Sequence, residues 1–373
     1  MIRSSAIAAV LFALPVASAA QHTHAPSRAI EFPDVKGYLT LVCDLHTHSA
    51  FSDGSVWPLI RVEEAVRDGL DCISTTEHLE YQPHKADIPH PDRNRSFQIA
   101  TESLKGRDLI VINGSEVTRS MPPGHANAVF IQDANRLLAD DPMDSFVEAQ
   151  RQGAFVFWNH PNWDAQKKDG IAAVWDVHKK LIADGMMHGI EVANDLTYSD
   201  EALAIALEYD LAILGNSDIH DLIDWQFEVP EGGHRPVTLV FATERTGPAI
   251  LEALRAHRTA AWFRDQLIGR PREVMPLIDA SLAVAGAKYR GETVILEVTL
   301  ENRGDAPFML LNESDYTFHQ DADLVVIEPH STYVLEVKTV TRMERVSLPF
   351  RVLNVTTAPD EHPLKTFEVA VQP

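Results

Sequence analysis

Histidines and carboxylates occur in this chain in pairs that are two residues apart. One such pair is His46 and His48, and another is Asp218 and His220. In an extended strand, residues i and i+2 point to the same face, so each pair can bind one cation. We therefore expect both pairs to lie at strand ends and to contribute to a metal site.

Further residues of these types follow other short apolar stretches of the sequence. The complete set of candidate ligands is His46, His48, Asp53, His78, Glu116, His125, His160, Asp218 and His220. Nitrogen and oxygen ligands without cysteine favour Zn, Mn or Fe. Nine ligands also exceed what one ion takes, so we expect two or three divalent metal ions as cofactors.

The scaffold that must position these residues is visible in the pattern between residues 37 and 263. Apolar runs cover 39–45, 70–74, 109–112, 126–131, 154–158, 189–192 and 211–214. Helical patterns lie between them, at 59–68, 96–104, 143–152, 172–183 and 199–208. Such alternation predicts an α/β domain with a parallel sheet and helical crossovers, and about seven units favour a closed barrel. All candidate ligands but His125 follow an apolar run or lie in the loop after one, where a barrel gathers strand ends.

The chain changes character near residue 272. Runs rich in Val, Leu and Thr cover 276–284, 292–300, 323–327, 331–339, 345–353 and 365–371, with turn residues between them. Short strands at this spacing predict a small antiparallel β-sandwich. We therefore divide the chain into a barrel at 37–271 and a β-sandwich domain at 272–373, in which no catalytic constellation is found.

The first twenty residues have the pattern of a secretory signal peptide. Arg3 precedes an apolar run over residues 7–16, and small residues follow at 17–20. We expect an exported protein, periplasmic or secreted, in which residues 21–36 form a flexible segment. Export would permit a disulfide between Cys43 and Cys72. Strand alternation, however, places the two thiols on opposite faces of the sheet, so we predict two buried free thiols.

Composition narrows the possible partners. The chain has 373 residues and a formal net charge of −22, with 45% hydrophobic residues. The acidic balance argues against nucleic acid, which needs a basic surface, and against docking on an anionic membrane. After the first twenty residues, no stretch is apolar enough to span a bilayer. We expect a small-molecule substrate, and the oligomeric state remains open.

The motifs together resemble the PHP (polymerase and histidinol phosphatase) superfamily of metal-dependent phosphoesterases. They are His46-Thr47-His48 with Ser52-Asp53-Gly54, Thr76-Glu77-His78, Gly114-Ser115-Glu116, Gly124-His125, Asn159-His160-Pro161 and Ser217-Asp218-Ile219-His220. The resemblance implies a distorted (β/α)7 barrel with two or three metals. It also implies ligand sets: His46, His48, Glu116 and Asp218 for the first metal; Asp53, His78 and His220 for the second; and Glu116, His125 and His160 for the third. Glu77 stands where the family usually has Asp, and alternation turns it away from His78.

A polar loop over residues 80–95 follows one of the ligand-bearing strands. It is either a solvated surface loop or a clamp that binds the anionic oxygens of a substrate through Arg93 and Arg95, with Tyr81 nearby. The loop and the β-sandwich also resemble those of secreted bacterial PHP phosphodiesterases that act on organophosphate diesters.

The chemistry of such a site favours phosphate esters. Two or three divalent ions would outweigh the charges of Asp53, Glu116 and Asp218 and make the pocket locally cationic. The metals would lower the pKa of a bound water, and the resulting hydroxide would attack phosphorus, with Asp218, His220 and His48 as catalytic residues. We expect a phosphodiesterase. Hydrolysis of another ester such as an aryl carbamate, a phosphomonoesterase and a non-catalytic binding protein remain alternatives.

Overall fold

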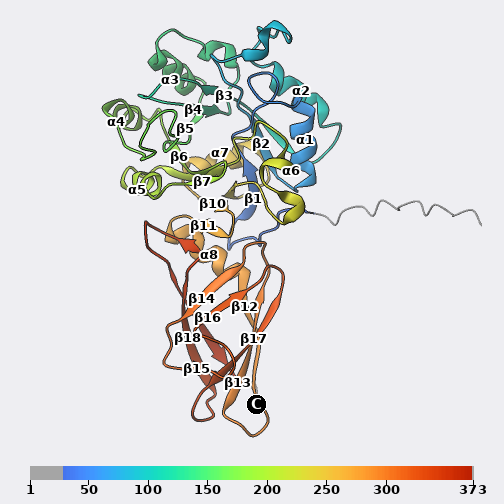
Figure 1. Cartoon of the computed structure of the whole chain (residues 1–373), viewed down its shortest axis with the longest axis vertical. Helices are drawn as coiled ribbons and strands as arrows, with labels where there is room; N and C mark the ends of the chain where they lie inside the picture. The colour runs from blue at the N-terminus through green and yellow to red at the C-terminus, as the bar shows by residue number, and fades with distance from the viewer. Residues whose placement is uncertain (1–27, 372–373) are drawn as a thin grey trace, which may run out of the picture.

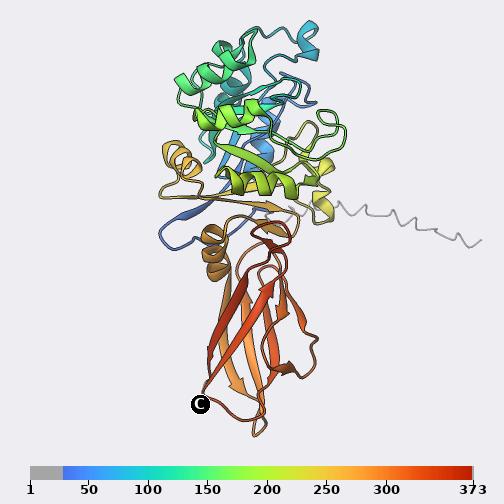
Figure 2. The same cartoon turned by 90° about the vertical axis from the view of Figure 1, so that its left-hand side faces the viewer.

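The computed structural model describes residues 28–371, which form two domains placed end to end (Figures 1 and 2). The predicted signal peptide at 1–20 and residues 21–27 lie outside the described residues. Residues 28–36 differ from the flexible segment that the sequence predicts. They pack against the first domain: Ile30 and Val35 are buried, and the backbone N–H of Ile30 donates to the carbonyl of Asp68 at 2.8 Å.

A mixed twelve-stranded sheet forms the first domain. Its strands are β1 (Leu39–Asp44), β2 (Cys72–Thr75), β3 (Ile110–Val117), β4 (Ala126–Val129), β5 (Phe155–Trp158), β6 (Gly189–Asn194), β7 (Thr197–Tyr198), β8 (Ala212–Asn216), β9 (Val237–Ala242), β10 (Thr259–Phe263), β11 (Gln266–Ile268) and β19 (Val355–Thr356). The helices are α1 (Pro58–Arg67), α2 (Arg95–Ser103), α3 (Pro142–Arg151), α4 (Asp176–Ala183), α5 (Asp200–Glu208), α6 (Ile223–Gln226) and α7 (Gly247–Arg255). The short 3-10 helices are η1 (Pro83–Ala86), η2 (Ala134–Leu137) and η3 (Val229–Glu231).

The pairing of the strands is only partly parallel. Strands β1, β2 and β3 pair in parallel, as do β5, β6 and β8, which agrees with the predicted helical crossovers. Strands β3, β4 and β5 instead pair antiparallel, as do β1, β9 and β10. The connection from β3 to β4, residues 118–125, contains no helix, and so short a link cannot return the chain for a parallel pairing. The α/β class is therefore confirmed, whereas a count of seven β/α units is not, because the sheet forms a half-barrel.

One apolar cluster takes side chains from seven strands of the sheet, β1 to β5, β8 and β9. It includes Leu45 after β1, Phe155 and Phe157 of β5, and Leu214 of β8, each at 0% exposure. These strands end at the residues predicted to bind metal, so this core fixes the positions from which the candidate ligands project.

Cys43 and Cys72 form a disulfide, which makes the prediction of two free thiols wrong. Strands β1 and β2 are in parallel register with Cys43 opposite Cys72, and the two Cα atoms are 4.7 Å apart. The prediction extends strand alternation from Cys72 to His78, but β2 ends at Thr75. The direction of His78 therefore carries no information about the direction of Cys72.

The second domain consists of two antiparallel sheets of four strands each, in the orders β12-β13-β17-β15 and β16-β14-β18-β20. The strands are β12 (Leu282–Tyr289), β13 (Ile295–Asn302), β14 (Phe308–Asn312), β15 (Thr317–Phe318), β16 (Leu324–Ile327), β17 (Thr332–Lys338), β18 (Arg345–Val352) and β20 (Leu364–Ala370). The antiparallel sandwich is as predicted. Its first predicted strand, 276–284, is mostly the end of helix α8 (Pro271–Ser281), so the strands begin at Leu282.

The two domains share a stretch of sheet. Strand β19 comes from the second domain and pairs in parallel with β11 at the edge of the first domain's sheet. The side chain of Asn354, just before β19, donates to the carbonyls of Asp265 and Pro307 at 2.6 and 2.7 Å. Within residues 28–371, no helix combines the length and the apolar character needed to cross a bilayer.

Candidate metal centre

The structure brings the nine predicted ligands together at one end of the curved sheet. His46 and His48 follow β1, His78 follows β2, Glu116 lies in β3, His125 precedes β4, His160 follows β5, and Asp218 and His220 follow β8. Asp53 comes from the loop at 49–54. Gly54 lies so close to the start of this loop that a Cβ would stand 2.8 Å from the Cα of Ser49, which explains why glycine follows Asp53.

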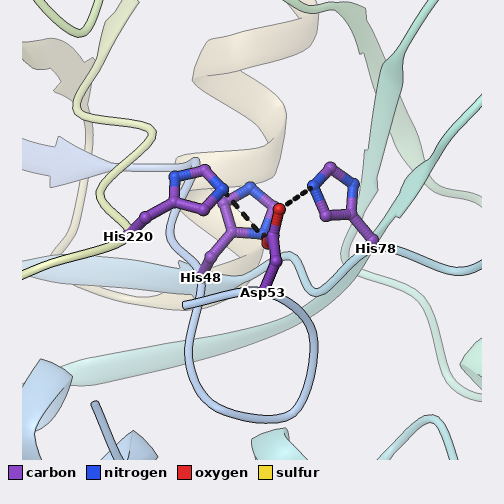
Figure 3. A group of neighbouring side chains, drawn as sticks. All are labelled: His48, Asp53, His78 and His220. Atoms are coloured by element: carbon purple, nitrogen blue, oxygen red, sulfur yellow. Dashed lines mark ion pairs between the residues drawn. The ribbon is translucent and has the colours of Figure 1, made fainter. Parts of the chain in front are cut away.

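The donor atoms fall into four overlapping groups, within each of which they lie no more than 4.8 Å apart. The groups are His48, Asp53, His78 and His220; His46, His160 and Asp218; His46, His48 and Glu116; and His78, Glu116 and His125. Figure 3 shows the first group, in which Asp53 lies between His78 and His220 at 3.3 and 3.1 Å. Because the groups share members, the cluster is one continuous centre with room for more than one ion.

Glu116 occupies the middle of this centre. Its two oxygens lie 2.5 Å from Nδ1 of His78, 2.9 Å from Nδ1 of His125 and 3.5 Å from Nε2 of His160. The residue is completely buried. This position agrees with the bridging role that the family resemblance implies for Glu116.

Asp218 forms a second junction. Its Oδ1 lies 3.1 Å from Nε2 of both His46 and His48. The backbone of Asp218 has a φ of 51°, in the left-handed region that non-glycine residues seldom adopt. The neighbouring Ser217 holds this turn in place, since its N–H and hydroxyl donate to the Asp44 carboxylate at 3.1 and 2.6 Å.

The charges of the centre are set by these contacts. Burial alone would raise the pKa of Asp53, but hydrogen bonds from His220 and His78 lower that pKa below its usual range. Burial would lower the pKa of His46, and the nearby charges of Asp218 and Glu191 raise it to about 10. Burial lowers the pKa of His48 to about 4, with His220 and His78 contributing in the same direction. The centre thus combines ionised carboxylates with a neutral His48 and a protonated His46, and a cation that bound to His46 would displace its proton.

Several buried ligand atoms have few well-aligned partners: most lie within ion-pair distance of a neighbouring ligand, but none makes a hydrogen bond of good geometry among the described residues. They are Oδ1 of Asp53, Oε2 of Glu116, Nδ1 of His125, Nδ1 of His160 and Oδ1 of Asp218. A buried polar atom without a well-formed hydrogen bond is costly and uncommon, so five in one cluster require an explanation. Metal ions would supply the missing partners, and the donor set fits them.

Glu191 is a residue of this centre that the sequence reasoning missed. Its Oε1 lies 2.9 Å from Nδ1 of His46, and its Oε2 accepts from the backbone N–H of His160 at 2.9 Å. The side chains of Asn194 and Asn216 also donate to it, at 2.7 and 2.9 Å. A signal was present in the sequence, because a carboxylate in the middle of an apolar strand is rare unless it is paired.

Other side chains support the ligands from outside the cluster. Asn159 donates to Glu116 at 2.8 Å, and the hydroxyl of Thr118 lies 2.7 Å from Nδ1 of His78. Glu77 accepts hydrogen bonds from the hydroxyls of Ser49, Ser52 and Ser96. These bonds place Glu77 outside the four ligand groups, as the sequence predicts, in a position that holds the loop carrying Asp53.

A cavity of about 680 Å³ opens above the cluster. Its lining includes six of the predicted ligands: Asp53, His78, His125, His160, Asp218 and His220. Tyr81 lines the cavity as well, and its contact with a substrate stays a prediction. The remaining wall residues are Thr118, Asn162, Trp163, Asp164, Asn194, Asp195, Thr197 and Gln226.

Arg93 and Arg95 do not line this cavity. The guanidinium of Arg93 donates to the carbonyls of Leu79 and His90 at 3.1 and 3.3 Å and to Oε1 of Gln82 at 2.8 Å. Arg95 begins helix α2 and contacts Gln98 and Glu102. Arg93 therefore stabilises the 80–95 loop through its hydrogen bonds. The geometry offers no support for the predicted binding of substrate by Arg93 and Arg95.

Comparison with known proteins identifies both domains. A family model described as an Ig-like domain matches residues 282–368. The chain is also similar to a two-domain protein from Bacteroides vulgatus, whose crystal structure is described as containing a predicted PHP-like metal-dependent phosphoesterase. The two sequences are 41% identical, and the alignment covers 91% of this chain and 98% of the Bacteroides chain. The two structures superpose with a TM-score of 0.86. No curated protein matches the chain.

More distant similarity extends to other solved structures. A putative metal-dependent phosphoesterase from Bifidobacterium adolescentis is 18% identical over 48% of this chain and 88% of its own, with a TM-score of 0.37. This likeness is too weak to add to the argument. The similarity over both domains to the Bacteroides protein, together with the ligand motifs, shows that this chain belongs to the PHP-like metal-dependent phosphoesterases.

Proposed function

We propose that this protein hydrolyses phosphodiesters in preference to phosphomonoesters, with two or three divalent cations held by the nine clustered residues. The observation that carries the proposal is the continuous cluster of buried ligand atoms at the floor of an open cavity, several of which make no well-formed hydrogen bond among the described residues. When bound, such cations act as Lewis acids that acidify water and neutralise charge on phosphoryl oxygens.

The proposed ligand sets combine those that the family resemblance implies with the contacts in the cluster, which add His48 to the set of Asp53, His78 and His220. One ion would be held by His48, Asp53, His78 and His220, a second by His46, His48, Glu116 and Asp218, and a third by Glu116, His125 and His160. Zn, Mn and Fe all suit imidazole and carboxylate ligands. Glu116 and His48 appear in two sets each, which would couple the ions to one another.

We assign three of these residues to catalysis, two beside the reacting atoms and one that supports them. Asp218 and His220 line the cavity directly. His48 lies behind them, with its ring stacked on that of His220 at a centroid distance of 4.3 Å. In the proposed reaction water adds to phosphorus, the bond to the alcohol oxygen breaks, and one proton of the water ends on the released alcohol. Asp218 would hold a cation beside these atoms, since its carboxylate lies at the cavity wall and contacts His46 and His48.

The charge of the cavity wall supports a diester over a monoester. Among the described residues that line the cavity there is no lysine or arginine, whereas Asp164 and Asp195 lie outside the four ligand groups. A phosphomonoester carries close to two negative charges at neutral pH, and a diester carries one. The acidic wall would therefore repel a monoester more strongly than a diester.

The test compares three substrates on the full-length, metal-loaded protein: bis-p-nitrophenyl phosphate, p-nitrophenyl phosphate and a naphthyl carbamate. We expect the highest kcat/KM for the diester. Asp218→Asn prepared in parallel reports any contaminating hydrolase. A higher kcat/KM for the monoester would overturn the diester preference, and activity on the carbamate alone would replace the phosphoesterase function with the alternative.

We further propose that the protein is exported. The signal-peptide pattern at residues 1–20 and the disulfide between Cys43 and Cys72 support this, because disulfides persist in oxidising compartments. Fractionation of expressing cells should find the mature chain in the periplasm or medium, beginning after residue 19 or 20. Thiol titration of that chain should find no reactive thiol before reduction. Recovery from the cytoplasm with an intact leader would overturn the proposal.

A further inference from the structure

The cavity walls above the candidate ligands combine aromatic rings with acidic side chains. Tyr81 and Trp163 are large apolar residues that remain 52% and 45% exposed. Asp164 and Asp195 line the same cavity, and none of the described lining residues is a lysine or arginine. Such walls differ from those expected around a purely anionic substrate.

Both aromatic rings are held by contacts with candidate metal ligands. Trp163 meets the rings of His125 and His160 edge-on, at centroid distances of 5.6 and 5.2 Å. Tyr81 meets the ring of His78 edge-on at 5.8 Å. The two rings are therefore fixed beside the place where the phosphate would bind, and parts of both remain open to a ligand.

Neither of the two carboxylates forms an ion pair with a lysine or arginine among the described residues. Asp164 is exposed and forms neither an ion pair nor a hydrogen bond there, while the nearby Lys167 pairs with Asp169 instead. Asp195 accepts a hydrogen bond from the neutral side chain of Gln226 at 2.5 Å. Burial raises the pKa of Asp195, and the charge of Asp218 acts in the same direction. A cation bound in the cavity would offset the negative charges of both carboxylates.

We propose that these walls bind an ammonium group, so that the preferred substrate is a zwitterionic phosphodiester of an amino alcohol. The inference rests on the proposed phosphodiesterase function and names its substrate class. The phosphate monoanion would bind over the ligand cluster, while the ammonium would meet the faces of Trp163 and Tyr81 and the carboxylate of Asp164. Aromatic faces and carboxylates are the groups that recognise quaternary and primary ammonium ions.

A pair of substrates with the same shape isolates the ammonium charge. They are the p-nitrophenyl phosphodiesters of choline and of 3,3-dimethylbutanol, which differ only in a nitrogen cation replaced by a neutral carbon. We expect kcat/KM to be about ten-fold higher for the choline ester, because a partly desolvated cation–π contact and a carboxylate each contribute on this scale.

Two variants of Asp164 test whether the preference for the choline ester depends on this carboxylate of the cavity wall. Asp164→Asn should reduce kcat/KM for the choline ester far more than for the neutral ester, and Asp164→Glu should restore much of the preference. Asp87→Asn is the matched control, because Asp87 is also exposed and forms no ion pair in the described chain but does not line the cavity. It should leave both rates unchanged.

Each outcome decides between the two proposals. Hydrolysis of both esters at equal rates, or faster cleavage of the neutral ester, would overturn the ammonium site while keeping the phosphodiesterase function. Cleavage of neither ester would overturn that function. Calorimetry with phosphocholine and 3,3-dimethylbutyl phosphate would then decide the ammonium site: tighter binding of phosphocholine supports it, and equal affinity overturns it.

Discussion

The carboxylate of Glu191 lies directly behind the imidazole of His46, with Oε1 2.9 Å from Nδ1, on the side of the ring opposite Asp218. This contact holds the ring so that Nε2 points to Asp218 and the cluster, where a bound cation would displace its proton. Carboxylates in this position orient metal-binding histidines and raise their basicity.

Removal of this charge should weaken metal binding. We expect Glu191→Gln to lower the affinity for the metals by about 10–100-fold, the range typical of such supporting residues. Metal content after dialysis against graded chelator measures the effect. Glu208→Gln, at an exposed position of α5, is the control. Unchanged metal retention in Glu191→Gln would show that the hydrogen bond only supports the fold.

Removal of the metals should abolish activity and lower thermal stability. The ligand carboxylates are ionised and close together, so bound cations would stabilise the folded state relative to the unfolded state. Chelator treatment should lower Tm, and added Zn, Mn or Fe should restore both Tm and turnover. Elemental analysis of active protein should find two or three ions per chain, and one ion or none would contradict the ligand assignment.

Asp218 should be essential for turnover without being essential for folding. Its carboxylate lies in the cavity floor and contacts two histidines. We expect Asp218→Asn to lower kcat/KM by on the order of 10³-fold or more, because both a ligand and a group at the reacting atoms are lost. Circular dichroism should show an unchanged fold. A rate near that of the unchanged protein would exclude Asp218 from the reaction.

Arg93 should matter for stability rather than for catalysis. Its guanidinium satisfies two backbone carbonyls of its own loop, so Arg93→Ala should reduce the free energy of unfolding by about 1–3 kcal/mol. Arg95→Ala, which removes only surface contacts, should change it by less than about 0.5 kcal/mol. Urea unfolding and kcat/KM should be measured on both variants. A large loss of kcat/KM in Arg93→Ala with unchanged stability would return the residue to the predicted role of binding substrate.

The sequence predicted the site correctly where residues that can bind metal stand directly beside apolar runs that form strands. The ligand residues stand out because each is polar beside a buried apolar strand, and the ends of such strands must meet. Glu191 was missed because it lies inside a strand, where the apolar pattern of its neighbours hides it. The disulfide was missed because alternation holds only within β2, and Cys72 was related to a residue beyond the end of that strand.

Two further differences follow from interactions that a single sequence does not display. The antiparallel pairing of β4 with β3 and β5 was missed because the sequence interpretation assumed a helical crossover, and the connection at 118–125 is too short to hold one. The guanidinium of Arg93 turns inward to carbonyls of its own loop, and residue type alone cannot distinguish this position from contact with a substrate.

The pairing of β19 with β11 has a consequence for how this protein can be divided. Without the second domain, β11 would be an unpaired sheet edge with open N–H and C=O groups, which is a template for strand addition between molecules. A fragment that stops after α8 would keep every candidate ligand and still be prone to self-association. The second domain thus covers an edge strand that would otherwise pair with other molecules, so the first domain depends on the second to avoid self-association through this edge.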